Sequence, residues 1–354
     1  MTIIERFREA FFTSHSGAAL VISPSNRLYL TQFSSSDGAV LVTENDNYLI
    51  VDFRYYEMAK EKCNDFKVIL SEKGLLKTVK DLCNDIGVKT IFVEDNYLTV
   101  SQNKRVFEVL ENLNVLYLGD LIENLRVIKT ADEIRKIKES QKLTDAAYSR
   151  VLEILRVGIT ENDVAAEIEY FFRKNGAEAA FKTIAVSGKK SSCPHGEPTD
   201  ALLTENSFLT MDFGAKLDGY CSDMTRTVVL GKCNDEMREI YDIVYTAQHK
   251  ALEVIKKDVL GNEVDFAARD YISQKGYSEA FGHSTGHALG IDVHEMPSFS
   301  MNYKKSIPEN SVLSVEPGIY LEGKYGVRIE DIVVITANGY ENLTKSDKKL
   351  IEIN

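Results

Sequence analysis

The 354-residue sequence predicts an α/β (α+β) fold in two domains, a smaller one over residues 1–126 and a larger one over residues 127–354. Length is the first observation, because a single hydrophobic core rarely extends beyond ~250–300 residues. The second is the alternation of short β-rich runs and helical patterns in the first part of the chain, which is typical of a small α/β domain. The third is an internal repeat in the second part, which predicts two similar halves related by a pseudo-twofold axis.

The first domain is predicted from four β-rich runs and one helical pattern. Two runs flank the polar segment Glu44–Asn47, which suits a hairpin loop. The helical pattern LLKTVKDLCND separates the last two runs. The four expected strands are Ala39–Val42, Tyr48–Val51, Val68–Leu70 and Thr90–Val93.

Two capping boxes predict where the first helices of the second domain begin. Thr130 with Glu133 opens a long helix, and Thr160 with Asp163 opens a shorter one. The shorter helix is expected to stop at Asn175-Gly176, since glycine is favoured just past a helix end.

The second domain then repeats itself at a constant offset of one hundred residues. Residues 151–181 align without a gap on residues 251–281. Each copy reads as the end of a long helix, a cap, a short helix, a glycine stop and a β-rich segment with histidines. We therefore expect helices covering one side of the strands and a site between the two halves.

The composition argues against nucleic acid and membranes as partners. The net charge is −12 and no basic block interrupts it, so an anionic polymer or membrane surface would be repelled. Glu5 and Arg8 interrupt the apolar N-terminus, and no stretch reaches the ~18 apolar residues of a membrane span. The five cysteines are odd in number and lack paired metal-ligand spacing, which indicates reduced thiols in the cytoplasm.

Two aspartates are expected on one face of a β-hairpin. If the turn is centred on Asp218-Gly219, Asp212 faces Thr225 and Asp223 is its diagonal neighbour; if it is centred between Leu217 and Asp218, Asp212 faces Asp223 directly. Alone, this hairpin favours a solvent-exposed polar face over a pair of ligands. The expected strands are Thr210–Phe213 and Tyr220–Val229.

Two glutamates change that balance. Glu316 follows the apolar run Val312–Val315, and Glu330 is the interior charge of the apolar run Val327–Thr336. Buried glutamates are rare unless paired. A salt bridge from Arg328, which shares the face of Glu330 by the period of two, is an alternative, but it would account for one acid of the four.

Four neighbouring carboxylates repel one another unless protons or cations neutralise them. Two divalent cations would cancel the charge, with His287 of the glycine-rich FGHSTGHALGIDVHE segment as a nitrogen ligand. Oxygen-rich ligands with one imidazole favour Mn²⁺ or Co²⁺, with Fe²⁺ or Zn²⁺ as alternatives. A lone histidine in such a loop is more often structural, so the hypothesis depends on the whole set. Four of the six histidines lie in the motif segments, namely His195, His283, His287 and His294.

Five segments in this order resemble the pita-bread metallopeptidases, and within them the Xaa-Pro aminopeptidases and prolidases. They are LRVIKTADEI, SGKKSSCPHGEPTD, MDFGAKLDGYCSDMTRT, FGHSTGHALGIDVHE and SVEPGIYLEGKYGVRIEDIVV. RLYLTQF and DFRY resemble the creatinase-type N-terminal domain of that group. The resemblance implies a pita-bread catalytic domain over residues 127–354 and a creatinase-like N-terminal α/β domain over residues 1–126.

The resemblance also implies a ligand set. Asp212 would bind one metal ion, and His287 with Glu316 would bind the other. Asp223 and Glu330 would bridge the two ions. Glu316 would also carry the proton of the attacking water.

Substrate-side roles follow from the same resemblance. His294 would stabilise the tetrahedral intermediate, and His195 would face the substrate from the other half of the cleft. His283 would contact the residue after the scissile bond, with Tyr320 and Arg328 on the substrate side. The sequence departs from the family at two points: Lys182 stands where relatives often have an acidic residue, and GHS at residues 282–284 replaces the usual GHG.

The leading hypothesis is therefore a dinuclear exopeptidase, a homodimer, acting on proline-containing peptides or dipeptides. The Xaa-Pro bond lacks an N–H, so a dedicated pocket must replace the usual backbone contact. A non-catalytic pita-bread protein that binds peptides or proteins is one alternative, and a creatinase-like amidinohydrolase is another. The complete acidic set argues against both.

Overall fold

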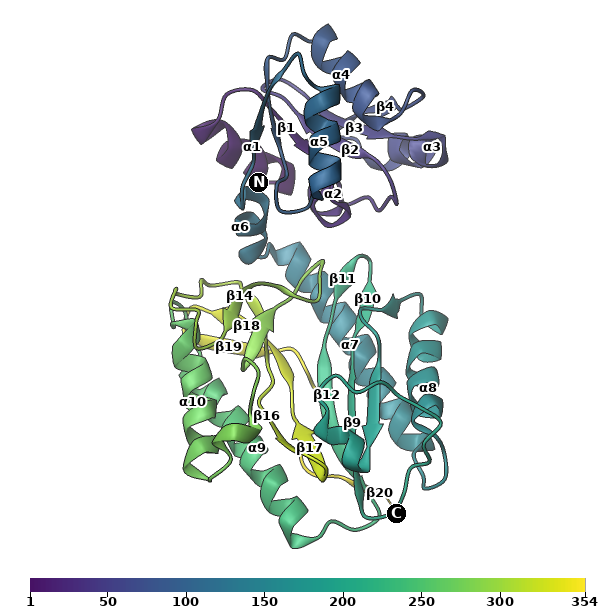
Figure 1. The fold of residues 1–354 in the computed structure, drawn as a ribbon, viewed down its shortest axis with the longest axis vertical. Helices are drawn as coiled ribbons and strands as arrows, with labels where there is room; N and C mark the ends of the chain where they lie inside the picture. The colour runs from purple at the N-terminus through teal and green to yellow at the C-terminus, as the bar shows by residue number, and fades with distance from the viewer. Residues whose placement is uncertain (354) are drawn as a thin grey trace. The chain divides into compact units, whose positions relative to one another are not determined.

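The computed structural model describes residues 1–353. It divides into two compact units, Met1–Arg126 and Val127–Asn354, each with its own core (Figure 1). The observed fold is the expected mixed α/β one.

The first unit is built on a six-stranded sheet in the order β4-β3-β2-β1-β5-β6. Strands β1, β2 and β3 pair antiparallel, and the other neighbours pair parallel. The predicted hairpin is present, because Thr43 N donates to Asp46 O at 2.9 Å and closes the loop. The strands are β1 Ala18–Val21, β2 Ala39–Val42, β3 Asn47–Val51, β4 Lys67–Leu70, β5 Thr90–Val93 and β6 Asn114–Tyr117. The helices are α1 Ile3–Ser14, α2 Pro24–Thr31, α3 Phe53–Lys62, α4 Leu75–Asp85, α5 Val100–Val109 and α6 Leu121–Val127.

The second unit contains four long helices and two larger sheets. One sheet has the order β20-β12-β9-β8, and the other has the order β14-β13-β15-β18-β19. The helices are α7 Ala131–Ile154, α8 Glu161–Lys174, α9 Asp235–Val254 and α10 Gly261–Gln274, with short 3₁₀ turns at η1 Gly188–Ser192 and η2 Ser278–Ala280. The strands are β7 Glu178–Ala179, β8 Ile184–Ser187, β9 Ser207–Phe213, β10 Ala215–Leu217, β11 Tyr220–Cys221, β12 Met224–Leu230, β13 Gly286–Ala288, β14 Glu295–Phe299, β15 Val312–Val315, β16 Gly318–Leu321, β17 Tyr325–Arg328, β18 Asp331–Thr336, β19 Gly339–Asn342 and β20 Glu352–Ile353.

The sequence repeat is a structural repeat. Helices α7 and α9 end one hundred residues apart, and α8 and α10 begin and end at the same offset. Gly176 and Gly276 follow the short helices with φ of 80° and 88°, a backbone conformation in which a side chain is unfavourable. Both predicted capping boxes are present at Thr130 and Thr160. The two halves therefore share one local plan, as the predicted pseudo-twofold arrangement requires.

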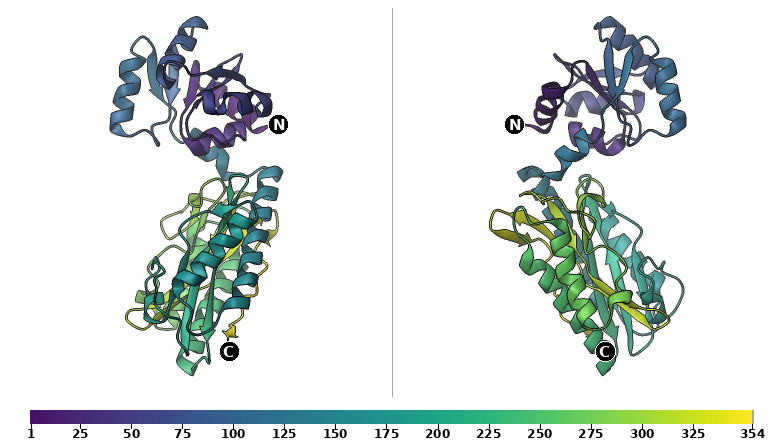
Figure 2. Two further views of the ribbon diagram at one scale, coloured as in Figure 1. Left: turned by 90° about the vertical axis from the view of Figure 1, so that its right-hand side faces the viewer. Right: turned by 60° about the vertical axis from the view of Figure 1, so that its left-hand side comes forward.

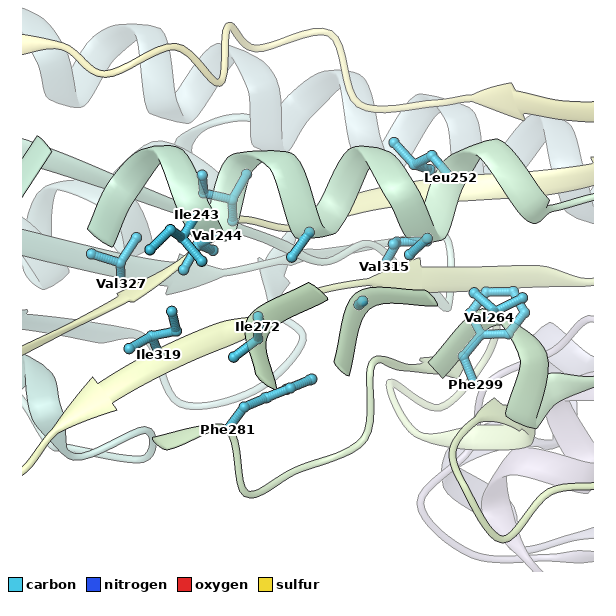
Figure 3. Close-up of a cluster of buried hydrophobic side chains, with 14 of the residues drawn as sticks. Ile243, Val244, Leu252, Val264, Ile272, Phe281, Phe299, Val315, Ile319 and Val327 are labelled. Carbon is cyan, nitrogen blue, oxygen red and sulfur yellow. The ribbon is translucent and has the colours of Figure 1, made fainter. Parts of the chain in front are cut away.

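Apolar packing between helices and strands holds each half together. Helix α7 packs on α8, and α9 packs on α10. Figure 2 shows these helix pairs beside the strands in two further views. In the second half, buried side chains of α9 and α10 contact buried side chains of the strands. Ten residues of this buried cluster are labelled in Figure 3. At roughly 25 cal/mol per Å² of buried apolar surface, such a core supplies most of the stabilisation. Among residues 1–353, no helix has both the length and the apolar character that a bilayer crossing needs.

The expected strands around the acidic residues are interrupted, which corrects the sequence prediction. The run Tyr220–Val229 splits at Ser222-Asp223 into β11 and β12. At this split the backbone comes close to Gly214, where an added Cβ would lie 1.8 Å from Ser222 O. Likewise Val327–Thr336 splits between β17 and β18, so Glu330 lies at a break and not inside a strand. Of the two registers left open, Asp212 pairs with Thr225.

Candidate active site

A cavity of about 570 Å³ opens in the second unit and is lined by residues of both halves. Nine of the ten side chains selected from the sequence line it. They are His195, Asp212, Asp223, His283, His287, His294, Glu316, Arg328 and Glu330. The tenth, Tyr320, hydrogen-bonds two of these residues. The fold therefore brings the predicted set together from segments more than one hundred residues apart.

Each of the four acidic side chains selected from the sequence enters the cavity from a strand, a strand end or a break between two strands. Asp212 lies on β9 and Asp223 between β11 and β12. Glu316 directly follows β15, and Glu330 lies between β17 and β18. Thr225 lies opposite Asp212 in the β9–β12 ladder, and its hydroxyl donates to Glu330 Oε2 at 2.8 Å. The ladder register thus fixes the two carboxylates relative to each other.

His287 on β13 faces this acidic group. Its Nε2 lies 3.2 Å from Glu316 Oε1 and 3.7 Å from Asp223 Oδ2. Ligand atoms of Asp223, His287 and Glu330 all lie within 4.8 Å of one another. Such convergence of carboxylate oxygens and an imidazole nitrogen is what a divalent transition-metal ion requires.

Three oxygens of this group have no hydrogen-bond partner among the described residues. They are Asp212 Oδ1, Asp223 Oδ1 and Glu330 Oε1, and all three atoms are buried. An unsatisfied buried polar group costs about 1–3 kcal/mol, and more when charged. These carboxylate oxygens therefore fit cations, which would supply the missing partners and neutralise the negative charge.

The pKa values reflect the same crowding. Burial, then the negative charges of Glu330, Asp212 and Glu316, holds the pKa of Asp223 well above its usual range. Burial and the charges of Glu316 and Asp212 raise the pKa of Glu330 in the same direction. Burial also opposes ionisation of Glu316, but the hydrogen bond and charge of His287 outweigh it and lower the pKa of Glu316 to about 2. Without cations, the protein disfavours the ionised forms of two acids of the set.

A second polar chain joins Asp212 to the substrate-side residues. Arg328 Nη2 donates to Asp212 Oδ2 at 2.7 Å, and Arg328 Nη1 donates to the Tyr320 hydroxyl at 2.8 Å. That hydroxyl also hydrogen-bonds His283 Nε2 at 2.8 Å. Burial, partly offset by Arg328, raises the pKa of Tyr320 to about 12, so the phenol stays protonated. Arg328 pairs with Asp212, whereas the sequence had suggested Glu330 as its salt-bridge partner.

His294 and His195 lie on connections that enter the cavity from opposite halves. The His294 ring lies edge-on to His287 with centroids 4.4 Å apart, and burial followed by the charge of His287 lowers the pKa of His294. His294 is therefore neutral at pH 7, able to donate or accept one hydrogen bond. Its connection is anchored by the next residue, Glu295, in a buried ion pair with Lys129 at 3.1 Å.

Sequence reasoning missed two buried carboxylates that hold the histidine-bearing connections. Glu161 accepts from Ser187 N and Thr199 N, which bracket His195. Asp265 accepts from Thr285 N and from Arg269, whose other nitrogens donate to Phe281 O and His283 O. Asp265 could have been found, because it interrupts the apolar stripe of α10. Glu161 stands at the first position of α8 and gives no comparable signal.

The fold of two similar halves with an acidic, histidine-containing cavity fits the class of metal-dependent hydrolases. Residues 135–337 match Metallopeptidase family M24, and the chain belongs to this family and is an enzyme. Residues 3–128 match the Creatinase/Prolidase N-terminal domain. The resemblance that the motifs predicted is confirmed. Because the chain is an enzyme, the alternative of a non-catalytic binding protein is excluded.

Relatives cover nearly the whole chain. A Xaa-Pro dipeptidase of Pyrococcus horikoshii is 36% identical, with 96% of each chain covered. An uncharacterized peptidase of Bacillus subtilis is 38% identical over 98% of this chain and 99% of its own length. Among solved structures, a Xaa-Pro dipeptidase from Bacillus anthracis superposes with a TM-score of 0.94 at 37% identity, covering 99% of this chain and 98% of its own. An X-Pro aminopeptidase from Thermotoga maritima superposes with a TM-score of 0.92 at 36% identity. The match covers 98% of this chain and 100% of its own.

Proposed function

We propose that the protein is a dinuclear metal-dependent exopeptidase that hydrolyses the bond between an N-terminal residue and proline. The observation that carries this proposal is the set of three unpartnered, buried carboxylate oxygens in one cavity with His287. Residues 127–354 form the catalytic domain in this proposal, and residues 1–126 form the creatinase-like N-terminal domain. The names of the relatives support the choice of proline substrates.

Five side chains would hold the two ions. Asp212 would bind one, His287 and Glu316 the other, and Asp223 with Glu330 would bridge them; Mn²⁺ or Co²⁺ is favoured, with Fe²⁺ and Zn²⁺ as alternatives. When bound, the ions would neutralise the carboxylates, polarise the scissile carbonyl and make a water more acidic. The free Oδ1 atoms of Asp212 and Asp223 and the free Oε1 of Glu330 are the atoms that this assignment uses.

The chain's own side chains would move the proton and position the peptide. Glu316, whose carboxyl is ionised at neutral pH, would accept a proton from the attacking water. It would then pass the proton to the proline nitrogen, which must be protonated to leave. His294 would donate a hydrogen bond to the carbonyl oxygen as negative charge develops there.

The remaining residues would act on the substrate's two ends. His283, held by Tyr320 and Arg328, would contact the proline side of the scissile bond. His195 would face the substrate from the other half of the cavity. We further propose a cytoplasmic homodimer that binds neither nucleic acid nor membranes. The free thiols of all five cysteines support the cytoplasm, and sedimentation velocity would test the dimer.

The decisive assay offers three substrates to protein that has been stripped of metal and reloaded with Mn²⁺ or Co²⁺. Ala-Pro and Ala-Pro-Ala test the proposed activity, and creatine tests the amidinohydrolase alternative. We expect free alanine from one or both peptides only after metal is restored. Failure to cut either peptide in the loaded protein would remove the proposal, and release of urea from creatine would favour the alternative.

A further inference from the structure

A charged pair at the mouth of the cavity has no role in the function proposed above. Lys182 Nζ lies 2.7 Å from Glu197 Oε1, and both residues line the cavity. Their side chains are 68% and 69% exposed, so water screens the pair and a competing carboxylate can displace Glu197 from Lys182. The pair is therefore an accessible contact, unlike the buried ion pairs elsewhere in this unit.

Lys182 is the available cation of the cavity. Among the described residues that line it, Lys182 and Arg328 carry a permanent positive charge. The guanidinium of Arg328 is buried and already donates to Thr225, Tyr320 and Asp212. A negatively charged group entering the cavity thus has one exposed partner of permanent opposite charge, Lys182, whose present partner is the equally exposed Glu197.

The neighbouring residue adds a second donor. Thr183 is 1% exposed and lines the cavity, yet its Oγ1 has no hydrogen-bond partner among residues 1–353. A buried hydroxyl without a partner costs free energy unless a ligand or water satisfies it. The hydroxyl and the ammonium belong to consecutive residues that both line the cavity, and such donors suit a carboxylate.

The backbone places these two donors close to the reacting centre. Ile184, the next residue, pairs with Asp212 across the β8–β9 ladder. Lys182 is two residues away, ~7 Å along an extended chain, and its long side chain spans a comparable distance. In an Xaa-Pro dipeptide the free carboxylate lies one residue beyond the scissile bond, ~3.8 Å by Cα spacing.

We propose that Lys182, with the Thr183 hydroxyl, binds the free carboxylate of a dipeptide, so that the enzyme prefers Xaa-Pro to longer peptides. The inference rests on the proposed function and assigns its substrate length. A dipeptide carboxylate replaces Glu197 as the partner of Lys182. A longer peptide presents a neutral amide at the same place. That amide separates Lys182 from Glu197 and leaves the ammonium without a partner of opposite charge.

The test compares Ala-Pro, Ala-Pro-amide and Asp-Pro-amide, each of which differs from the one before it at a single group. The Mn²⁺-loaded full chain is used as wild type, Lys182→Gln and Glu197→Gln. Lys189→Gln is the matched control, because Lys189 is an exposed lysine of the same segment that does not line the cavity. Metal content is measured for every variant.

Lys182→Gln is expected to raise KM for Ala-Pro about fivefold, the upper range for an exposed ion pair. The kcat of Lys182→Gln for Ala-Pro and its KM for Ala-Pro-amide should each change less than twofold. Glu197→Gln should lower KM for Ala-Pro, because it frees the ammonium, and Lys189→Gln should match wild type. Equal shifts for Ala-Pro and its amide, or no shift, would overturn the inference. So would a shift confined to Asp-Pro-amide, which would assign Lys182 to an acidic residue before proline.

Binding separates this inference from the proposed activity. If the loaded wild type cuts none of the three, the proposed function fails, and titration calorimetry with the same compounds decides the inference. An affinity for Ala-Pro about fivefold above that for the amide, lost in Lys182→Gln, supports carboxylate recognition. Equal affinities overturn it.

Discussion

Replacing Glu161 by glutamine should destabilise the catalytic unit and loosen the segment that carries His195. Glu161 is fully buried at the first position of α8, where the helix dipole favours a negative charge. Its Oε1 accepts from Ser187 N at 2.7 Å and Ser187 Oγ at 3.1 Å. Its Oε2 accepts from Thr199 N, Thr199 Oγ1 and Lys190 Nζ at 2.9–3.1 Å.

The magnitude follows from these contacts. Glutamine keeps one acceptor oxygen, but its NH₂ group replaces the other and faces a backbone N–H. That unsatisfied N–H donor costs about 1–3 kcal/mol. Lost charge assistance and the lost helix-dipole term add roughly 0.3–1 kcal/mol. The ion pair with Lys190 adds little, because that side chain is 31% exposed and screened. We expect a loss of about 3 kcal/mol in the free energy of unfolding.

Urea unfolding and hydrogen exchange measure the two effects separately. Exchange of the amides of Ser187 and Thr199 should accelerate, while KM for a peptide rises and metal content stays unchanged. Glu169→Gln is the matched control on the same helix, since Glu169 is exposed; it should change stability by less than ~0.5 kcal/mol. A loss below ~1 kcal/mol in Glu161→Gln, with exchange between residues 187 and 199 as in wild type, would refute the reasoning.

Three further changes test the acidic group and the histidine beside it. Asp223→Ala should abolish binding of both ions, and two ions per chain by elemental analysis would contradict its bridging role. His294→Ala should keep the metal content but reduce kcat about 10²-fold or more; an unchanged kcat would refute its contact with the carbonyl oxygen. In metal-free protein, Glu330→Gln should raise the melting temperature by a few degrees, because it removes a buried carboxyl group that must either take up a proton or repel its acidic neighbours. In metal-loaded protein it should lower that temperature, and equal shifts in both states would contradict the cation argument.

Local signals predicted most of the fold. The capping boxes at Thr130 and Thr160 and the glycine at residue 176 fixed helix ends that the structure reproduces. These features depend on neighbouring residues alone, so a single sequence contains them. The constant offset between α7–α8 and α9–α10 was also visible, since the same stops recur at Gly176 and Gly276. The resemblance to a known family supplied the rest of the predicted site.

Strand continuity could not be predicted in the same way. The break at Ser222-Asp223 coincides with the approach of Gly214 to Ser222 O, a contact that periodicity within one strand does not encode. The hydrogen bonds of Glu161 and Asp265 likewise depend on connections twenty or more residues away. Only Asp265 interrupts an apolar stripe, so the sequence alone offers a reason to single it out and none for Glu161.

These breaks in the strands explain how one cavity holds so many acids. Inside a strand, side chains alternate between faces, so neighbouring residues cannot point the same way. Asp223, Glu316 and Glu330 all lie at ends or interruptions of strands, where the backbone is free of that alternation. Their carboxylates can then converge on Asp212 and His287, at the expense of buried oxygens that no protein donor satisfies. The same departures from regular structure that make the site hard to predict therefore accompany the carboxylate oxygens that no donor of the described residues satisfies.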